Sequence, residues 1–255
     1  MNKIAALLII LFLPACAHSS AQKDAVFQNA PIDALMAGCY AGTMSVGDLK
    51  ERGDFGLGTL DALDGEMVVL DGSFYQIKQD GKAELLQKTA TSPFATLVFF
   101  KPTFEFSSGE VMDYKELAAF LDKKIPSPNL IYAVKVEGEF SVLKVRSAAR
   151  QEKPYRALTE AINEQKIFEL KNIRGTLVGF RYPPYMGGVN VPGYHFHFLS
   201  ADKTIGGHVL DLEGKDLRIE VDQNRVFLME LPGTEEFMKF RFEGDSEEAL
   251  AKVEK

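Results

Sequence analysis

Apolar and polar residues alternate along much of the first half of the chain, and short turns separate the alternating runs. Residues 59–70 read TLDALDGEMVVL, with the pair Asp64-Gly65 between two apolar runs, which is the commonest signal for a short β-hairpin. A second pair, Asp71-Gly72, predicts that the chain turns again into a further strand. The run TLVFF at 96–100 is apolar on both faces, as expected of a buried strand. This region therefore predicts an antiparallel meander.

Three segments show helical spacing instead. The segment YKELAAFL at 114–121 follows Asp113, a residue type that often caps the start of a helix. The segment YRALTEAINEQKIF at 155–168 places its aliphatic residues on one side, which predicts an amphipathic helix. Residues 245–254 predict a terminal helix with a capping residue at its first or second position.

The rest of the second half again has the pattern of strands. Two strands are expected at 131–136 and 140–145, with a hairpin turn at Glu137-Gly138. Further strand patterns lie at 175–182, 194–199, 208–212 and 217–228. We therefore predict a mixed α+β fold of mainly antiparallel or mixed sheet with a few helices, in one unit or in two sheet-based subdomains.

Three of the four histidines lie within fourteen residues of one another, in the segment YHFHF at 194–198 and at His208. Residues two apart on a strand share a face, so His195 and His197 point the same way and the flanking aromatic residues point the other way. If residues 201–204 form a hairpin turn, His208 lies directly opposite His197. Directly opposed Cβ atoms are about 4.5 to 5.5 Å apart. The pattern therefore predicts a three-histidine metal site on a β-hairpin.

The donor set suggests which metal this site binds. Three neutral imidazoles without a cysteine suit Zn²⁺, although iron, cobalt, nickel and manganese accept the same donors. Three protein ligands leave coordination positions open, which is typical of catalytic rather than structural zinc sites. A lone histidine is more often a satisfied polar residue than a ligand, so the shared face of all three carries the prediction.

Composition and charge exclude nucleic acid as a partner and exclude two classes of protein. The 255 residues include 29 Lys and Arg against 36 Asp and Glu, which gives a formal net charge of -7. No block of basic residues is present, so the chain lacks the electrostatic footprint of a nucleic-acid-binding protein. Gly and Pro usage is ordinary and there are only 2 cysteines, which excludes a disulfide-framed or collagen-like chain.

The N-terminal residues predict an export signal. Lys3 precedes an apolar run at 4–13, which is too short to span roughly 30 Å of hydrocarbon. The segment LPAC at 13–16 resembles the lipobox of bacterial lipoproteins, in which the cysteine is acylated and becomes the mature N-terminus. Ordinary signal cleavage close to Cys16 or after Ala21 is the alternative.

This interpretation divides the chain into three parts. Residues 1–15 are a signal peptide, residues 16–28 a tether and residues 29–255 the functional region. We expect export from a bacterial cytoplasm and attachment, through lipid on Cys16, to a membrane facing the periplasm or the exterior. Secretion is the expectation if the ordinary cleavage operates.

Several short motifs together resemble the alpha-acetolactate decarboxylase family. They are GTL at 58–60, DGEM at 64–67, PFA at 93–95, VRS at 145–147, PY at 154–155, GT at 175–176, GG at 187–188, and GYHFH at 193–197 with His208. The resemblance covers residues 50–212 and is weaker towards the C-terminus. It implies a metal-dependent enzyme that converts 2-acetolactate to acetoin and CO₂, and that generally forms a homodimer of mixed α/β chains.

The resemblance also implies residue roles. The three clustered histidines would bind zinc, Glu66 and Arg146 would face the substrate, and Thr59 would support them. Glu254, in the short motif VE at 253–254, resembles a glutamate that the family uses near its C-terminus. Without the resemblance, the default interpretations are a strand-edge carboxylate for Glu66, a surface cation for Arg146 and a solvated terminal residue for Glu254.

The expected chemistry follows from the substrate. Loss of CO₂ from a 2-hydroxy-3-oxo acid leaves an enediolate, which a Lewis-acidic metal stabilises. Glu66 or Glu254 would then deliver a proton, which requires a pKa raised by burial or by the second carboxylate. Two other functions stay open at this point: an exported zinc-binding or zinc-transfer lipoprotein, and a zinc metallohydrolase with Glu66 as its base.

Overall fold

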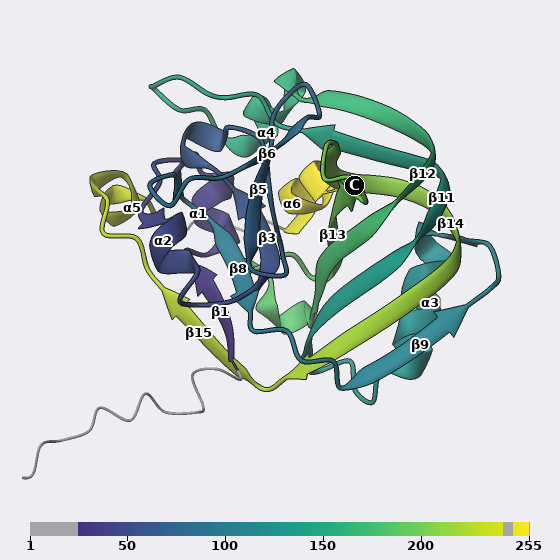
Figure 1. Cartoon of the computed structure of the whole chain (residues 1–255). Helices are drawn as coiled ribbons and strands as arrows, with labels where there is room; N and C mark the ends of the chain where they lie inside the picture. The colour runs from purple at the N-terminus through teal and green to yellow at the C-terminus, as the bar shows by residue number, and fades with distance from the viewer. Residues whose placement is uncertain (1–24, 242–246, 255) are drawn as a thin grey trace, which may run out of the picture.

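The computed structural model describes residues 25–241 and 247–254 of the chain (Figure 1). The expected signal peptide at 1–15, the tether up to residue 24 and the expected helix cap at 245–246 lie outside these residues. Residues 25–28, which we assigned to the tether, form most of a fully buried strand, so the tether boundary at residue 28 is wrong. Their side chains are apolar or amide-bearing, and they complete a sheet rather than face water.

The first large sheet has seven strands in the order β15-β1-β8-β3-β4-β5-β6. Only β15 and β1 are parallel, and the other neighbours are antiparallel. The predicted turn at Asp71-Gly72 is confirmed, because Leu70 pairs with Ser73. The hairpin of β3 and β4 is also present, but Thr59 pairs with Glu66, so its connection is the longer segment 60–65 with a 3₁₀ turn at Asp61–Leu63 rather than a two-residue turn at Asp64-Gly65. The strands are β1 (Ala25–Asn29), β3 (Phe55–Thr59), β4 (Glu66–Leu70), β5 (Ser73–Ile77), β6 (Ala83–Leu85), β8 (Ala95–Val98) and β15 (Val226–Glu230).

The second large sheet is built from long curved strands, which occupy the right side of Figure 1. Its order is β10-β14-β11-β12-β13, with β9 paired to β14. Because β13 also pairs with β14, the four strands from β11 to β14 close on themselves. The strands are β9 (Phe104–Ser108), β10 (Met112–Asp113), β11 (Ile131–Ser147), β12 (Lys166–Tyr182), β13 (Gly193–Ser200) and β14 (Gly206–Asn224). A third, two-stranded sheet joins β2 (Met44–Ser45) to β7 (Thr91–Ser92).

The helices are few and short, which confirms the predicted fold class. The predicted helix at 114–121 is present, and Asp113 caps it through a capping box with Glu116. No helix within the described residues is long and apolar enough to cross a membrane. The helices are α1 (Ile32–Met36), α2 (Val46–Leu49), α3 (Tyr114–Lys124), α4 (Leu158–Ala161), α5 (Glu235–Lys239) and α6 (Glu247–Glu254), with 3₁₀ turns η2 (Asp61–Leu63), η3 (Ile162–Glu164) and η4 (Pro184–Met186).

The hairpin expected at Glu137-Gly138 is wrong. Both residues lie inside β11, which continues without a turn and pairs with β12 and β14. The pairing with β14 shifts register here, and a Cβ at Gly138 would lie 2.5 Å from the Leu217 side chain. This glycine permits close packing at a bulge rather than a reversal of the chain.

The helix expected at 155–168 is also wrong in extent. Only α4 and η3 are helical, and residues from Lys166 onward belong to β12. Gln165 has an extended backbone, and Lys166 then pairs with Ser147 of β11. Pairing with a distant strand overrides the local helical spacing. In the same way, the segment expected at 208–212 and most of the one expected at 217–228 merge into the single strand β14, whereas residues 226–228 belong to the separate strand β15.

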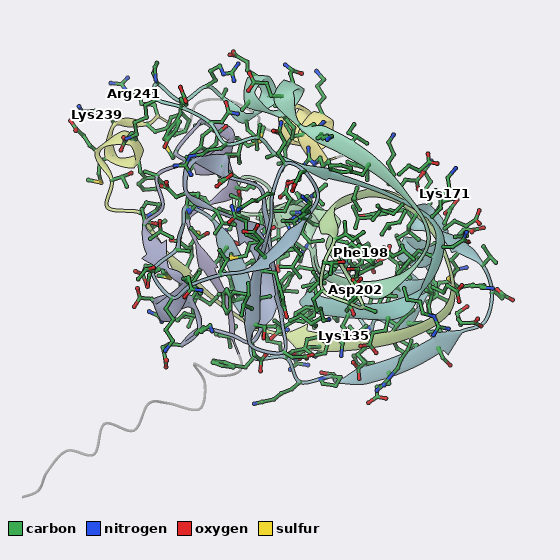
Figure 2. All side chains as sticks on the ribbon, turned by 45° about the horizontal axis from the view of Figure 1, so that its top comes forward. Lys135, Lys171, Phe198, Asp202, Lys239 and Arg241 are labelled. Carbon is green, nitrogen blue, oxygen red and sulfur yellow. The ribbon has the colours of Figure 1, made fainter. Side chains whose placement is uncertain are left out.

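The two large sheets share one apolar cluster, so they form one packed unit rather than separate subdomains. Side chains of β3 and β4, including Leu57 and Val68, meet side chains of β11 to β13, including Val178 and Phe180. A second cluster fills the curved sheet, where Phe198 is completely buried (Figure 2). The line where the two sheets meet is also where the histidines lie.

Candidate metal and substrate site

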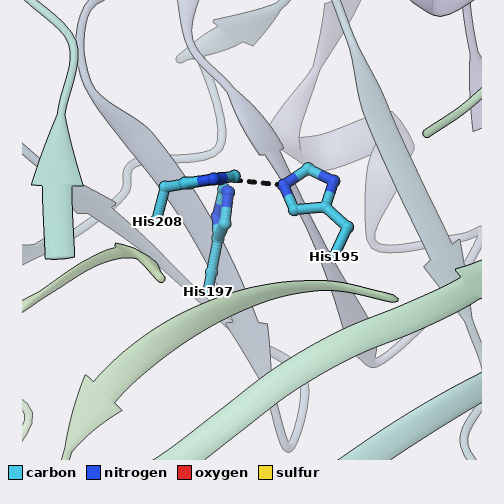
Figure 3. Close-up of side chains that lie close together, drawn as sticks. All are labelled: His195, His197 and His208. Atoms are coloured by element: carbon cyan, nitrogen blue, oxygen red, sulfur yellow. Dashed lines mark hydrogen bonds between the residues drawn. The ribbon is translucent and has the colours of Figure 1, made fainter. Parts of the chain in front are cut away.

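The histidine pair predicted from the hairpin register is confirmed. His197 of β13 lies directly opposite His208 of β14, and His195 is two residues away on the same face. The Nε2 atom of His195 and the Nδ1 atom of His208 are 3.0 Å apart and share a hydrogen bond (Figure 3). One ligand atom from each of the three residues lies within 4.8 Å of the others.

The seven-stranded sheet orients one of these rings. His197 donates a hydrogen bond from Nδ1 to the main-chain oxygen of Met67 in β4, over 2.8 Å. Because Nδ1 carries the proton, Nε2 keeps its lone pair and faces the other histidines. A contact between the two sheets therefore sets the tautomer of this imidazole.

Burial keeps two of the rings, His195 and His197, neutral. Each of the three histidines is 6% exposed or less. Burial first, and the positive charge of Arg146 second, lowers the pKa of His195 to about 3. Burial, followed by the neighbouring His195, holds the pKa of His197 well below its usual value. Neutral imidazole is the form that binds a metal.

The arrangement fits a bound divalent cation. Zinc–nitrogen bonds of about 2.0–2.1 Å place two ligands of a tetrahedron about 3.3 Å apart. The 3.0 Å separation between the His195 and His208 nitrogens is close to that value. Among the described residues, the group of side chains that could hold a metal ion comprises these three histidines, and a metal held by three protein ligands would keep positions open for other ligands.

Arg146 lies in the same row of side chains as two of the histidines. It pairs across β11 and β14 with His208, which in turn pairs with His197. Its side chain is buried, and its Nη1 atom donates to the Oε1 atom of Gln165 over 3.2 Å. The default interpretation of Arg146 as a surface cation is therefore wrong.

Glu66 and Thr59 come from the opposite sheet. They are partners across β3 and β4, and both are buried, so the default interpretation of Glu66 as a solvated carboxylate is wrong. The Oε2 atom of Glu66 lies 3.6 Å from the Nε2 atom of His197. Thr59 donates from its hydroxyl to the main-chain oxygen of Gly65 over 2.6 Å, which braces the loop that leads into Glu66.

All these side chains line one small cavity of about 40 Å³. One half is polar and the other is aliphatic or aromatic. The polar half comprises Thr59, Glu66, Arg146, His195, His197 and His208, and the apolar half comprises Ile32, Leu35, Gly58, Leu63, Phe94, Ala148, Leu158 and Ile162.

Glu254 belongs to helix α6, but its side chain lies outside the described structure. The neighbouring residues Leu250 and Val253 are 2% exposed and pack in the same apolar cluster as Leu158 and Phe94. Helix α6 is thus attached to the apolar wall of the cavity.

Sequence patterns alone missed two supporting contacts. Met67 acts through its main-chain oxygen, so its side-chain type carried no signal, although it adjoins Glu66 in the DGEM motif. Gln165 was hidden inside the helix wrongly expected at 155–168.

Comparison with known proteins agrees with this geometry. The family model for alpha-acetolactate decarboxylase matches residues 26–244. The alpha-acetolactate decarboxylase of Methanosarcina mazei is 48% identical over 237 residues, which cover 93% of this chain and 82% of the relative. That of Methylococcus capsulatus is 44% identical and covers 90% of this chain and 88% of the relative.

The fold is also similar to a solved structure. The crystal structure of alpha-acetolactate decarboxylase from Bacillus subtilis strain 168 superimposes with a TM-score of 0.88 at 33% identity, and the match covers 90% of this chain and 98% of that one. Sequence and structure comparisons therefore name the same family across most of the chain, which includes every described site residue. The chain belongs to the alpha-acetolactate decarboxylase family.

Proposed function

We propose that this chain converts 2-acetolactate to acetoin and CO₂, as a carboxy-lyase that uses a divalent metal. The observation that carries the proposal is the convergence of three buried imidazoles, one arginine and one carboxylate on a single cavity, with burial holding His195 and His197 in the neutral form by lowering the pKa of each. Family membership supports the same activity. Neither alternative, the zinc-transfer lipoprotein or the zinc metallohydrolase, has support among the relatives.

Zinc is the metal that we propose, held by His195, His197 and His208. When bound, the metal supplies a Lewis acid to the keto and hydroxyl oxygens of the substrate. The protein's part is to present three buried imidazole nitrogens, with the His197 ring fixed by Met67. The charge on Arg146 opposes protonation of His195 and so favours the ligand form.

Arg146 is proposed to bind substrate oxygens. A guanidinium offers several planar donors to a carboxylate or to an oxygen that gains negative charge. Holding only the departing carboxylate stabilises the ground state as well, so the catalytic benefit comes from donors that face the developing charge. The pairing of Arg146 with His208 and the effect of its charge on His195 support a role for these donors beside the proposed metal ligands.

Glu66 is proposed as the group that handles the proton. After CO₂ leaves, one carbon of the enediolate must be protonated from one side, which decides the handedness of acetoin. Glu66 is buried beside His197 at the edge of the cavity. Glu254 is proposed as the second carboxylate, carried by α6, and Thr59 as the brace of the Glu66 loop.

The apolar half of the cavity is proposed to receive the methyl groups of the substrate. Its lining side chains offer no hydrogen bonds that water would need. Exclusion of water strengthens the electrostatic interactions in the polar half.

The test of the activity supplies purified, metal-loaded protein with racemic acetolactate and measures CO₂ and acetoin. The proposal expects both products in equal amounts, far above the rate in buffer. No acceleration over buffer, with the metal retained, would reject it. Cleavage of ester or amide substrates instead would favour the metallohydrolase.

The proposed location rests on the N-terminal sequence. We propose export and a lipid anchor on Cys16 because the segment LPAC follows a short apolar run. The variant Cys16→Ser is expected to move the protein from the membrane fraction to the soluble fraction. Unchanged fractionation would favour ordinary signal cleavage.

We also propose a homodimer. Strand β15 ends the seven-stranded sheet, and its region carries many of the exposed large apolar side chains, namely Val226, Leu228, Met229, Leu231, Met238 and Phe240. Leu228→Lys is expected to lower the mass measured by light scattering from dimer to monomer. The matched control is Leu85→Lys on β6 at the other edge, which should leave the mass unchanged. A monomeric wild type would contradict the proposal.

A further inference from the structure

Leu63 lines the metal cavity from the connection between β3 and β4, and its side chain is 3% exposed. It belongs to the 3₁₀ turn η2. The connection leads from Thr59 at the end of β3 to Glu66 at the start of β4, and both of these residues also line the cavity. One short stretch of chain therefore carries an apolar wall of the cavity together with two of its polar residues.

The backbone of η2 has an unusual conformation. Ala62 has φ 60° and ψ 27°, and Leu63 has φ 56°, so two successive residues with side chains occupy the left-handed region. Residues other than glycine rarely adopt this conformation, because the Cβ atom crowds the backbone. Such strain persists only where the surrounding structure holds the backbone in place, and it is concentrated at functional sites.

Neighbouring segments hold η2 in this conformation. The main-chain nitrogen of Ala62 donates to the main-chain oxygen of Tyr40 over 2.8 Å, and its main-chain oxygen accepts from the nitrogen of Gln151 over 2.7 Å. The Oδ1 atom of Asp61 accepts a hydrogen bond from the main-chain nitrogen of Gly42 over 2.8 Å. The side chain that η2 contributes to the cavity therefore cannot withdraw easily when a larger group enters.

The chemistry of the substrate places an alkyl group next to the proton donor. The carbon of 2-acetolactate that loses CO₂ carries a methyl group, and the proposed role of Glu66 is to deliver a proton to that same carbon. A side chain on the connection that leads into Glu66 is thus well placed to contact the methyl group. Because the cavity is small, about 40 Å³, contact at this point limits the length of the alkyl group.

We propose that Leu63 is a specificity-determining residue, which sets the largest alkyl group that a substrate can carry on the carbon that loses CO₂. The inference rests on the proposed function, in which the apolar half of the cavity receives the methyl groups of the substrate. A rigid wall is selective because it does not repack around extra methylene groups. One methylene group in an apolar pocket changes specificity by roughly 10- to 200-fold.

The test uses 2-acetolactate and two homologues in which ethyl or n-propyl replaces the methyl group on the reacting carbon. For the zinc-loaded wild type, kcat/KM should fall with each added methylene group. Leu63→Ala should raise the ratio of kcat/KM for the propyl substrate to that for the methyl substrate by roughly tenfold or more. Leu63→Met keeps a similar volume and should keep the ratio within about threefold of the wild-type value.

A binding measurement supplies a readout that does not depend on turnover. In the 2,3-dihydroxy-2-alkylbutanoates an alcohol replaces the ketone, so no carbonyl group accepts the electrons that loss of CO₂ releases. Calorimetry should show that the wild type binds the 2-methyl compound more tightly than the 2-propyl compound. In Leu63→Ala the difference in affinity should shrink by a factor similar to that seen in turnover.

Met36→Ala is the matched control. Met36 of α1 is buried and packs in the same apolar cluster as Leu63, but it is not among the described residues that line the cavity. Both truncations should lower the free energy of unfolding, because each leaves a space in the cluster. Only Leu63→Ala should change the ratio between the propyl and methyl substrates.

Three results would overturn the inference. They are an unchanged ratio in Leu63→Ala, an equal rise of the ratio in Met36→Ala, and a wild type that binds and converts all three alkyl compounds equally well. A failure of the proposed activity has a different signature: the wild type would convert none of the three substrates, while its preference for binding the 2-methyl compound would remain.

Discussion

The cavity has two halves that differ in how they are held and in what their loss is expected to change. The polar half consists of side chains whose positions depend on strand register, such as His197 opposite His208 and Thr59 opposite Glu66. The apolar half consists of side chains from short helices and loops, such as Leu158 of α4. The comparison indicates that sheet pairing sets the chemistry, whereas helix packing supplies enclosure and stability.

The largest effect is expected in the polar half. His197→Ala removes one of three metal ligands and should lose bound zinc and decarboxylation together, by roughly 10³-fold or more in rate if the metal is the essential Lewis acid. Metal content by mass spectrometry and acetoin formation measure the two losses. The control is His18→Ala, which changes a histidine outside the described residues and should alter neither quantity. Stoichiometric, tightly bound zinc in His197→Ala would show that the polar half of the cavity does not bind the metal through His197.

Glu66→Gln tests the carboxylate separately from the metal. It should lower kcat by roughly 10²- to 10⁴-fold, the range for loss of a general acid or base, because the amide does not exchange a proton in its place. Zinc content should equal that of the wild type, since the metal ligands proposed among the described residues are the three histidines. Wild-type turnover by this variant would remove Glu66 from the proposed role and leave Glu254 as the candidate.

Leu158→Ala tests the apolar half. Leu158 is 4% exposed, so the change creates a cavity and should lower the free energy of unfolding by about 2–5 kcal/mol. Denaturant titration measures the loss. Leu85→Ala, at a side chain that is 62% exposed, should cost about 0.5 kcal/mol or less. If Leu158→Ala abolished zinc binding while the free energy of unfolding stayed unchanged, the division between the two halves would be wrong.

A change of pH is expected to have a smaller effect on the free energy of unfolding of the metal-free protein. In the unfolded chain a histidine takes up a proton below about pH 6.5, whereas burial lowers the pKa of His195 to about 3 in the fold. The unfolded state then binds more protons, so the free energy of unfolding should fall gradually as the pH drops below 6.5. Denaturant titrations of chelator-treated protein at pH 7.5 and 5.5 measure it. A higher stability at pH 5.5 would contradict the buried, neutral state of these rings.

The parts of the site that sequence predicted are those governed by short-range geometry. The two-residue period and the turn near residue 203 were enough to place His197 opposite His208. Local patterns failed where distant strands decide the structure. Residues from Lys166 onward pair with β11 despite their helical spacing, and Gly138 accommodates Leu217 rather than a turn.

Local sequence patterns could not predict that Arg146 and Glu66 line the same cavity. They come from different sheets, and no local sequence pattern predicts that these two sheets pack together where His195, His197 and His208 lie. The family resemblance predicted their association, and the structure places both in the cavity lining. Main-chain contacts such as that of Met67 cannot be predicted from residue type, because every residue has a main-chain oxygen.

The central claim is that three imidazoles hold one metal ion on which activity depends. The most direct test adds zinc in steps to chelator-treated protein and measures acetoin formation against zinc bound per chain. The account predicts that activity rises in proportion to bound zinc and reaches its plateau at one ion per chain in the wild type, with no recovery in His197→Ala. Full activity without bound metal, or recovery in the variant with the same stoichiometry, would contradict it.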